Sequence, residues 1–348
     1  MLLSSLILPF ASFMACCTAA STKKIEARMP GARVTKIDSY LCHAIKINST
    51  TPLYITQFVP QASMQQLHHM LLYGCLWPGH TDQIWNCGEM DDGSANDMYK
   101  KGGTCGYGPP KILYAWARNA PKLTLPEGVG FMIGPGSQVN YLVVQMHYLM
   151  PQEQPNFSGL EIATTDVVQP KLASVLLLGT RGYMRPQSEE FFETSCVIGD
   201  QITLNPFAFR THTHANGILV TGWKVTRDAG SGHTWEMIGQ RDPLDPQMFY
   251  PVFNPNMTIT TGDVVAARCR MENHSNRTIR IGNKGTDEMC NFYMMYWVDG
   301  GRTLSGDICF SHGPPNWYFN RSTQLTNVPQ NELEIYRIDE LNELLPNL

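Results

Sequence analysis

The pentapeptide Arg210-Thr211-His212-Thr213-His214 follows a strand-like run at residues 205–209 and leads into another at residues 218–221. Side chains alternate between the two faces of a β-strand. We therefore expect His212 and His214 to point the same way, with Arg210 beside them on that face. Two such imidazoles can share a metal ion, since histidine is the commonest metal ligand. The alternative is a solvated strand end in which His and Thr alternate by chance.

Strand-like runs recur along most of the chain and are separated by clusters of Pro, Gly and Asn, for example at residues 39–47, 53–59, 138–148 and 174–178. Few stretches keep a helical period for three turns. This pattern predicts an all-β protein, and it favours β-sandwiches because they manage the edges of many short strands. The polar stretch 21–30 predicts a loose segment, and residues 331–345 predict a short, solvated helix.

The 348 residues are more than one core usually covers, so we expect two domains, with residues 151–156 as the best linker. The predicted boundaries are residues 28–150 for the first domain and 151–345 for the second. The net charge of −4 and the lack of a basic run argue against nucleic acid as a partner.

Residues 1–20 have the short apolar core and the small residues near the end that are typical of a secretory signal peptide. The run is too short to span a bilayer and is broken by Pro9, and no other stretch is long enough, so we expect no membrane span. Six sequons agree with a secreted protein or one of the secretory-granule lumen: Asn48, Asn156, Asn256, Asn273, Asn276 and Asn320.

Removal of the signal peptide would leave eight of the ten cysteines, four before residue 110 and four after residue 190. An even number in a secreted chain indicates four disulfides, although eight cysteines allow about a hundred pairings. Their division along the chain fits two domains that are each cross-linked internally.

A second histidine pair, His68-His69, is weaker evidence for a metal, because neighbours in a regular strand face opposite ways. A bulge or a loop could bring the two rings together, and His147 could complete a site of three imidazoles. The alternative is one buried and one exposed histidine, with His147 in the core. Met289 precedes Cys290 and is either core filling or a thioether ligand held beside a disulfide. Thioether with imidazole favours copper, especially Cu(I), over zinc.

Several longer motifs occur in one order from about residue 28 to residue 310: residues 68–72, 113–121, 145–147, 210–214, 249–251 and 287–293. Together they resemble the peptidylglycine α-hydroxylating monooxygenases, the copper- and ascorbate-dependent enzymes of peptide amidation. The resemblance implies two jelly-roll-like β-sandwich domains with a solvent cleft between them. It also implies two copper ions, with ascorbate as electron donor and O2 as co-substrate.

The resemblance assigns the electron-transfer copper to His68, His69 and His147. It assigns the oxygen- and substrate-binding copper to His212, His214 and Met289, which are the catalytic positions. Its disulfides map to Cys42–Cys87, Cys75–Cys105, Cys196–Cys309 and Cys269–Cys290. A fifth family disulfide is missing, since Phe157 stands where one of its cysteines would be, and this puts in doubt how firmly the N-terminus is held.

The implied activity is hydroxylation of the α-carbon of the C-terminal glycine in glycine-extended peptides. Arg210 would bind the peptide carboxylate, helped by Asn291 and Tyr293, which follow Met289 at spacings of two and four residues. A lyase that acts on the hydroxyglycine product would be a separate protein, because the residues after 310 are too few to form one. One alternative is a hydroxylase of small amines like dopamine β-monooxygenase, which usually carries an extra domain and lacks an arginine at position 210. Another is a non-catalytic secreted copper-binding module.

Overall fold

The structure is a computed structural model that describes residues 22–88, 98–230, 232–282, 284, 286–322 and 325–330. The predicted signal peptide and the predicted tail helix at residues 331–345 lie outside the described residues. Within the described part, no helix is long and apolar enough to cross a membrane. In these described ranges the regular elements are strands, apart from one 3-10 helix, η1 (Phe319–Arg321).

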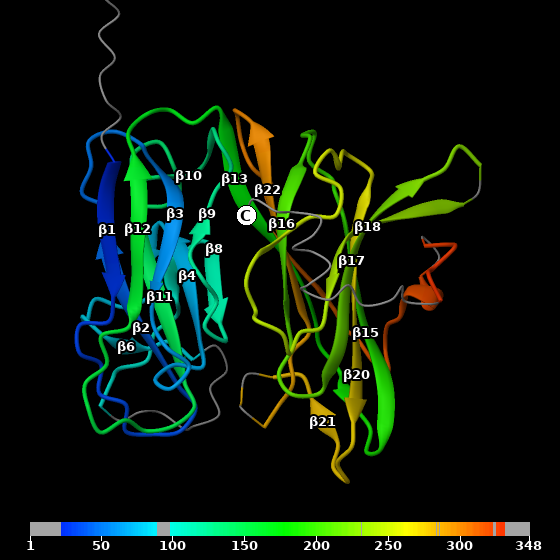
Figure 1. Ribbon diagram of the computed structural model, residues 1–348, viewed down its shortest axis with the longest axis horizontal. Coiled ribbons are helices and arrows are strands. Elements are labelled where there is room, and N and C mark those ends of the chain that lie inside the picture. The colour runs from blue at the N-terminus through cyan, green and yellow to red at the C-terminus, as the bar shows by residue number, and fades with distance from the viewer. Residues whose placement is uncertain are drawn as a thin grey trace, which may run out of the picture.

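Two β-sandwiches lie side by side, as predicted for an all-β chain with two domains (Figure 1). One layer of the first sandwich is a five-stranded sheet. Its strands, in spatial order, are β6 (Trp85–Asn86), β2 (Ser39–Lys46), β11 (Tyr141–Tyr148), β4 (His69–Cys75) and β8 (Lys111–Ala117).

The opposite layer is part of a ten-stranded sheet that continues into the second sandwich. Its strands in the first sandwich are β1 (Thr22–Arg28), β12 (Gly159–Thr165), β3 (Leu53–Gln61), β9 (Leu123–Thr124) and β10 (Val129–Ile133). Its strands in the second are β13 (Lys171–Thr180), β22 (Asn291–Asp299), β16 (Asn205–His212), β19 (Tyr250–Pro251) and β23 (Ile308–Ser311).

A four-stranded sheet forms the outer layer of the second sandwich, from β15 (Ser188–Val197), β20 (Val264–Asn273), β17 (Gly217–Arg227) and β18 (His233–Arg241). Two small ribbons complete the fold. These are β5 (Trp77–Pro78) with β7 (Cys105–Tyr107), and β14 (Tyr183–Met184) with β21 (Ile279–Arg280).

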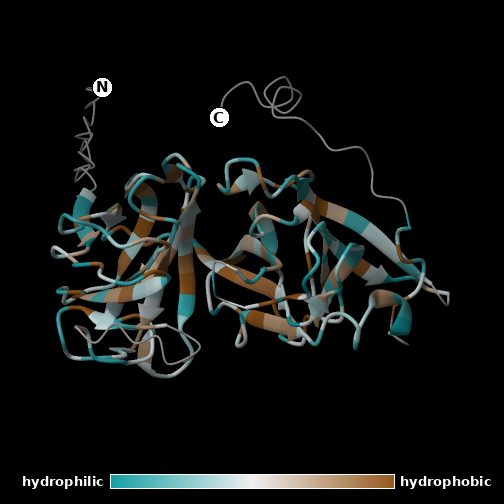
Figure 2. Ribbon diagram, turned by 90° about the horizontal axis from the view of Figure 1, so that it is seen from below, coloured by the Kyte–Doolittle hydropathy of each residue, from teal (hydrophilic) through white to brown (hydrophobic). Residues whose placement is uncertain are grey.

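Apolar residues concentrate on the strands, and Figure 2 shows such residues as brown segments of the ribbon in both halves of the molecule. The core of the first sandwich does not stop at the domain boundary. Tyr114 of β8 belongs to the same buried cluster as Phe249 and as Tyr293 of β22. The parallel pairs Val129–Lys171 and Gly130–Leu172 also join β10 to β13. Because sheet and core both cross the boundary, the two sandwiches are packed together without a gap at this place.

The predicted domain boundary at residue 150 is wrong by one strand. β12 pairs with β1 on one side and with β3 on the other, and its Leu160 and Ile162 are buried in the core of the first sandwich. The chain therefore crosses between Thr165 and Lys171. The composition of residues 151–156 marks a loop, but it does not show which sheet the following strand joins.

The N-terminal segment is a strand, in contrast to the loose conformation predicted for residues 21–30. β1 forms a ladder of seven residue pairs with β12, from Thr22–Thr165 to Arg28–Gly159. Arg28 also donates from Nε to the carbonyl of Phe157 at 3.1 Å. Main-chain pairing thus holds the N-terminus where the fifth family disulfide is missing.

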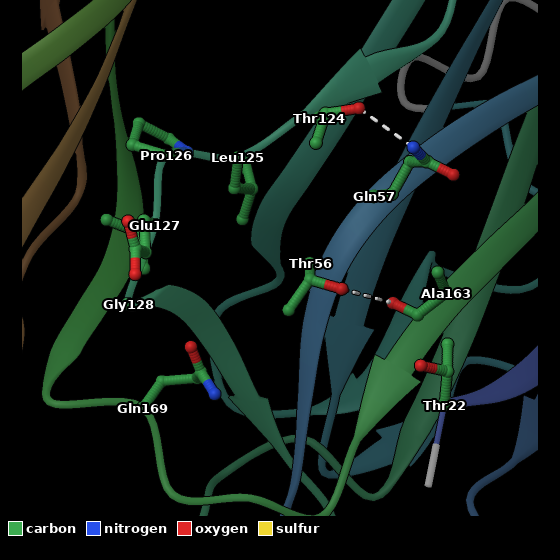
Figure 3. A pocket seen from close by; sticks show the side chains of 11 residues that line it. Thr22, Thr56, Gln57, Thr124, Leu125, Pro126, Glu127, Gly128, Ala163 and Gln169 are labelled. Atoms are coloured by element: carbon green, nitrogen blue, oxygen red, sulfur yellow. Dashed lines mark hydrogen bonds between the residues drawn. The ribbon is translucent and has the colours of Figure 1, made fainter. Parts of the chain in front are cut away.

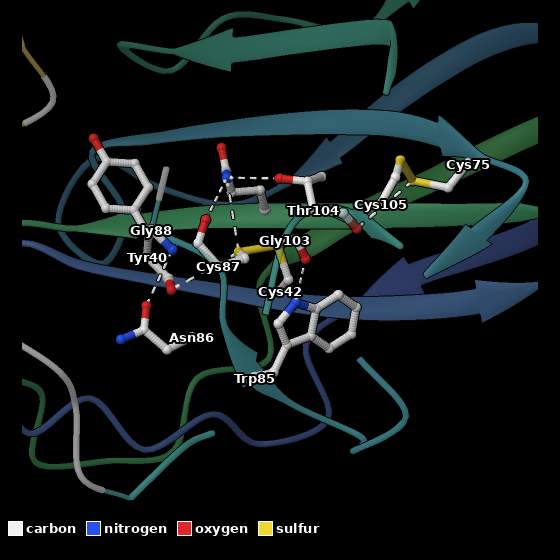
Figure 4. The surroundings of a disulfide bond; sticks show 11 residues. Tyr40, Cys42, Cys75, Trp85, Asn86, Cys87, Gly88, Gly103, Thr104 and Cys105 are labelled. Atoms are coloured by element: carbon white, nitrogen blue, oxygen red, sulfur yellow. Dashed lines mark hydrogen bonds between the residues drawn. A yellow bond between two sulfur atoms is a disulfide. The ribbon is translucent and has the colours of Figure 1, made fainter. Parts of the chain in front are cut away.

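The four disulfides of the structure are Cys42–Cys87, Cys75–Cys105, Cys196–Cys309 and Cys269–Cys290, the same pairs that the family resemblance implied. Figure 4 shows the two in the first sandwich, where the Trp85 indole donates to the carbonyl of Gly103 at 2.9 Å. Cys269–Cys290 ties β20 to the residue that precedes β22 and follows Met289.

Two of the six predicted glycosylation sites are buried in the fold. Asn156 is 2% exposed and Asn273 is fully buried. Their Nδ2 atoms, to which a glycan would be attached, donate instead to Gln152 and to the carbonyls of Arg185 and Arg277. The prediction is wrong for these two positions, while Asn48, Asn256, Asn276 and Asn320 are exposed and stay predictions.

Candidate metal centres

The first histidine group is assembled by two neighbouring strands of the five-stranded sheet. His69 begins β4, and His147 lies opposite it in β11. His68 stands just before β4, and its main-chain N–H donates to the carbonyl of His147 at 3.0 Å. Strand alternation therefore does not apply to the His68-His69 pair, and both rings turn toward His147.

The three rings of this group present the same nitrogen to one point. The Nδ1 atoms of His68 and His147 are 3.2 Å apart, those of His68 and His69 are 3.2 Å apart, and those of His69 and His147 are 3.4 Å apart. The centre of such a triangle lies about 1.9 Å from each corner (the side divided by √3), close to the roughly 2.0 Å of a metal–imidazole bond. The arrangement fits a metal ion bound by three imidazoles.

The surroundings keep these imidazoles neutral, as a metal requires. Burial is the main cause that lowers the pKa of His68 to about 4 and the pKa of His69 well below its usual range. Burial also lowers the pKa of His147. The Nε2 of His147 faces the Asp38 carboxylate at 3.2 Å, and its ring stacks on Tyr40 at 4.1 Å between centroids. Asp38 thereby places the proton on Nε2 and leaves the Nδ1 lone pair for the metal.

The second histidine group presents the other ring nitrogen. The Nδ1 of His212 is 2.7 Å from Gln247 Oε1, and the Nδ1 of His214 is 2.9 Å from the carbonyl of Asp287. A carbonyl oxygen can only accept, so Nδ1 of His214 carries the proton and Nε2 carries the lone pair. That Nε2 is buried and has no hydrogen-bond partner among the residues that the structure describes. A buried ring nitrogen with a free lone pair fits the role of a metal ligand.

Glu288 ties His214 to Met289. Its carboxylate is fully buried and accepts from the main-chain N–H groups of His214 and Met289. It also accepts from the main-chain and side-chain N–H groups of Asn216, both at 2.9 Å. Met289 is half-buried between this carboxylate and the Cys269–Cys290 disulfide. Its thioether is therefore held on a fixed backbone.

Arg210 is the cation of the second group. It is 2% exposed, and its guanidinium carbon lies over the Tyr293 ring, 5.1 Å from the centroid. Its Nε donates to the main-chain carbonyl of Gln247 at 2.9 Å, and one of its terminal nitrogens donates to Gln247 Oε1 at 3.2 Å. Burial lowers the pKa of Arg210, and no carboxylate among the described residues compensates for it. Tyr293 and Asn291 of β22 lie opposite Arg210 and His212 in the ladder with β16. The three predicted substrate residues are thus brought together.

The two histidine groups face each other directly. The ring centroids of His68 and His214 are 5.8 Å apart, and those of His69 and His212 are also 5.8 Å apart. This is closer than the predicted solvent cleft between the two sites would allow. Apolar contacts also cross the boundary at β8, where the rings of Tyr114 and Phe249 lie 6.2 Å apart between centroids.

Sequence reasoning missed three side chains that orient the candidate ligands: Asp38, Gln247 and Glu288. Each comes from a segment distant from the ring or backbone that it holds, except for Glu288 beside Met289. The carboxylate directly before the Met289-Cys290 pair is the one local signal that could have pointed to such a residue. The others become visible only in the folded structure.

A groove of about 340 Å³ lies elsewhere, against β3 and β12 of the first sandwich (Figure 3). Its walls include Thr56 and Gln57, and Gln57 donates to Thr124 at 2.8 Å. None of the candidate ligands lines it. Its one ionisable side chain is Glu127, so we assign it no function.

Comparison with known proteins gives two adjoining family matches. The model of the copper type II ascorbate-dependent monooxygenase N-terminal domain matches residues 25–155, and that of the C-terminal domain matches residues 171–322. Peptidyl-glycine alpha-amidating monooxygenase A of Xenopus laevis is 34% identical over 316 residues, which are 89% of this chain and 32% of that protein.

Two further relatives differ in name and in their identity to this chain. Peptidylglycine alpha-amidating monooxygenase of Rattus norvegicus is 34% identical over 86% of this chain and 29% of its own length. Tyramine beta-hydroxylase of Caenorhabditis briggsae is 22% identical over 69% of this chain and 41% of its own length. The chain thus spans about a third of the length of the amidating relatives that it matches.

Proposed function

The chain belongs to the copper type II ascorbate-dependent monooxygenases, and on that premise we propose that it hydroxylates the α-carbon of a C-terminal glycine in peptides. This is the first step of peptide C-terminal amidation. The names and the higher identity of the amidating relatives support a peptide substrate over a small amine. The product would then need a lyase to release the amide. The disulfides support a secreted protein or one of the secretory-granule lumen.

We propose two copper ions, one held by His68, His69 and His147 and one by His212, His214 and Met289. Bound copper would supply two one-electron carriers and a place for O2 to be reduced, with ascorbate as the electron donor. The imidazoles provide neutral nitrogen donors, and the thioether of Met289 favours Cu(I) in the second site. The convergent nitrogens of the first group and the orphaned Nε2 of His214 support this assignment.

One observation supports a peptide carboxylate as ligand most directly. The buried guanidinium of Arg210 has no carboxylate partner among the described residues, and it shares Gln247 with the candidate ligand His212. An unpaired charge in a protein interior is costly, so its place implies a partner that arrives later. The carboxylate of a peptide pairs with a guanidinium through two parallel hydrogen bonds, which fix direction as well as distance. Arg210 would thereby place the terminal glycine next to His212. The Tyr293 hydroxyl and the Asn291 amide can add donors.

Turnover of a model peptide that ends in glycine, dependent on both copper and ascorbate, tests the activity. Arg210→Ala should lower kcat/KM for that peptide. The loss of transition-state stabilisation should be roughly 2–5 kcal/mol, the range for loss of one partner of a buried charge pair. Arg210→Lys keeps the charge but loses the bidentate geometry, and it should lie between Ala and wild type.

The control is the same peptide with its C-terminus already amidated, measured as a competitive ligand. Its weak binding should hardly respond to Arg210→Ala. Equal loss for both peptides would show that Arg210 supports the fold and does not read the carboxylate. A wild-type protein that binds copper but does not hydroxylate the peptide would favour a non-catalytic copper-binding module.

A further inference from the structure

The turn that follows β8 has an unusual backbone. The N–H of Ala120 donates to the carbonyl of Ala117 at 3.1 Å, and the two central residues, Arg118 and Asn119, have φ of 52° and 55°. Positive φ at both central positions defines a type I′ turn, for which Asn and Gly are the favoured residues. Asn119 suits this conformation, whereas a long side chain such as that of Arg118 is disfavoured in it.

Neighbouring groups hold this turn in place. The Trp116 indole donates to the carbonyl of Ala120 at 2.9 Å, and Asn119 Oδ1 accepts from the N–H of Met64 at 2.9 Å. Strained backbone persists where the surroundings determine it, and it gathers at functional sites. The position of the Arg118 guanidinium is therefore the feature that needs an explanation.

Arg118 reaches across the domain boundary. Its guanidinium donates to the carbonyl of Leu244 in the second sandwich at 2.7 Å. Leu244 lies in the loop between β18 and β19. Inside this loop, the N–H of Leu244 bonds Asp242 Oδ1 at 2.8 Å, and Asp245 pairs with Arg241 at 2.8 Å. The contact thus fixes a loop that already has internal structure.

The same loop carries Gln247, which is 3% exposed. Gln247 accepts from both Arg210 and His212, as described above, and its own Nε2 donates to the carbonyls of Thr213 and Pro243 at 3.2 and 2.8 Å. Gln247 is only three positions after Leu244 in the sequence. A displacement at Leu244 would therefore move the group that orients both the substrate arginine and a candidate metal ligand.

We propose that Arg118 is a positioning residue, which sets the orientation of Arg210 and His212 from the other domain by holding the loop of residues 242–248. This inference rests on the proposed function, because the oriented groups are those assigned to substrate and metal. It explains why an arginine occupies a turn position that suits asparagine or glycine.

The decisive variant is Arg118→Asn. Asparagine keeps or improves the turn, so the melting temperature should not fall, but the guanidinium is lost. Amide hydrogen exchange in residues 242–248 should become about tenfold faster, and KM for the glycine-extended peptide should rise about tenfold with a smaller change in kcat. This size corresponds to one charge-assisted hydrogen bond near the protein surface. Arg118→Lys should recover part of both effects.

The matched control is a second link between the domains at the opposite end of β8. Lys111 pairs there with Asp307 at 3.4 Å, away from the loop. The double variant Lys111→Met/Asp307→Asn removes this link without leaving a buried charge unpaired. It should leave exchange in residues 242–248 and KM unchanged.

Two results would overturn the inference. One is an Arg118→Asn protein with the exchange rates and the KM of the wild type. The other is an equal rise of exchange and KM in Arg118→Asn and in Lys111→Met/Asp307→Asn, which would mean that both variants act by weakening the association of the domains in general. The exchange experiment does not need turnover. It therefore tests the loop contact even if the protein proves not to hydroxylate a peptide.

Discussion

The two histidine groups are built on opposite plans. The first is closed, with three imidazoles from neighbouring strands of one sheet, all presenting Nδ1 and spaced 3.2–3.4 Å apart. The second is composite, with two imidazoles held by their Nδ1 atoms so that Nε2 faces the site, and a thioether on a separate segment. In the first group one carboxylate orients one ring. In the second, Gln247 and Glu288 orient ligands and the substrate arginine together.

This difference separates two tasks. A rigid set of equal nitrogen donors suits an ion that only gains and loses an electron, because little has to move when its charge changes. A softer and more open set suits a site that also has to accept small molecules. The hydrogen bonds of Gln247 join Arg210 and His212, the proposed substrate and metal residues, in one network, whereas no described side chain of the first group joins two such residues.

His147→Ala should have the largest effect, because it removes one of only three donors of the closed group. Copper content after reconstitution should fall from two ions per chain to one, and peptide turnover should be lost. Elemental analysis together with the peptide assay checks this. If the variant still holds two ions, or if the wild type holds one, the division into two separate sites is wrong.

Acid should destabilise the metal-free protein through the first group. His68 has a pKa of about 4 in the folded state and about 6.5 when unfolded, so the unfolded chain binds more protons between these values. The contribution of His68 to the free energy of unfolding is therefore fully present above pH 6.5, and it is lost as the pH drops toward 4. The loss from His68 alone should reach about 3 kcal/mol (2.5 pH units at about 1.36 kcal/mol each), and His69 and His147 should add to it.

Urea unfolding of the metal-free protein at pH 7.5 and pH 4.5 measures this loss. His68→Asn removes one titrating ring, and it should reduce the difference between the two pH values. An unchanged difference would mean that acid acts elsewhere in the molecule.

The residues that orient the ligands should give smaller effects, each confined to one site. Asp38→Ala should weaken copper binding at the first site about 10–100-fold, and Gln247→Ala should do the same at the second, as is usual for partners of metal-bound histidines. Only Gln247→Ala should also raise KM for the peptide. Competition titrations with a copper chelator, run on both variants, compare the two sites directly. Loss at both sites from either variant would contradict two independent networks.

The strands and the pairing of His212 with His214 could be predicted from local pattern, because alternation and His spacing are properties of short segments. Residues 39–47 and 205–209 illustrate this, since both lie in strands close to the predicted limits. The resemblance to a known family added both sets of three ligands and the pairing of the cysteines. Neither source indicated that residues 22–28 form a strand, because their partner β12 is more than a hundred residues away.

The remaining features depend on contacts between distant segments. Asp38, Gln247 and Arg118 act on groups in other strands or in the other sandwich, and nothing in their neighbours in sequence reveals this. The sequons at Asn156 and Asn273 satisfy a local rule, yet both side chains are buried and hydrogen-bonded in the interior. The close approach of the two histidine groups likewise joins segments of both sandwiches, which no single segment encodes.

The sheet shared by both sandwiches also bears on how the molecule comes apart. Separation of the halves would break the β10–β13 pairing and expose the unpaired main-chain groups of two strands at once. It would also bring apolar side chains such as Tyr114 and Phe249 into water. Bare strand edges readily pair with other chains. A partly opened molecule would therefore be prone to aggregate, and the two halves are expected to melt as one cooperative unit.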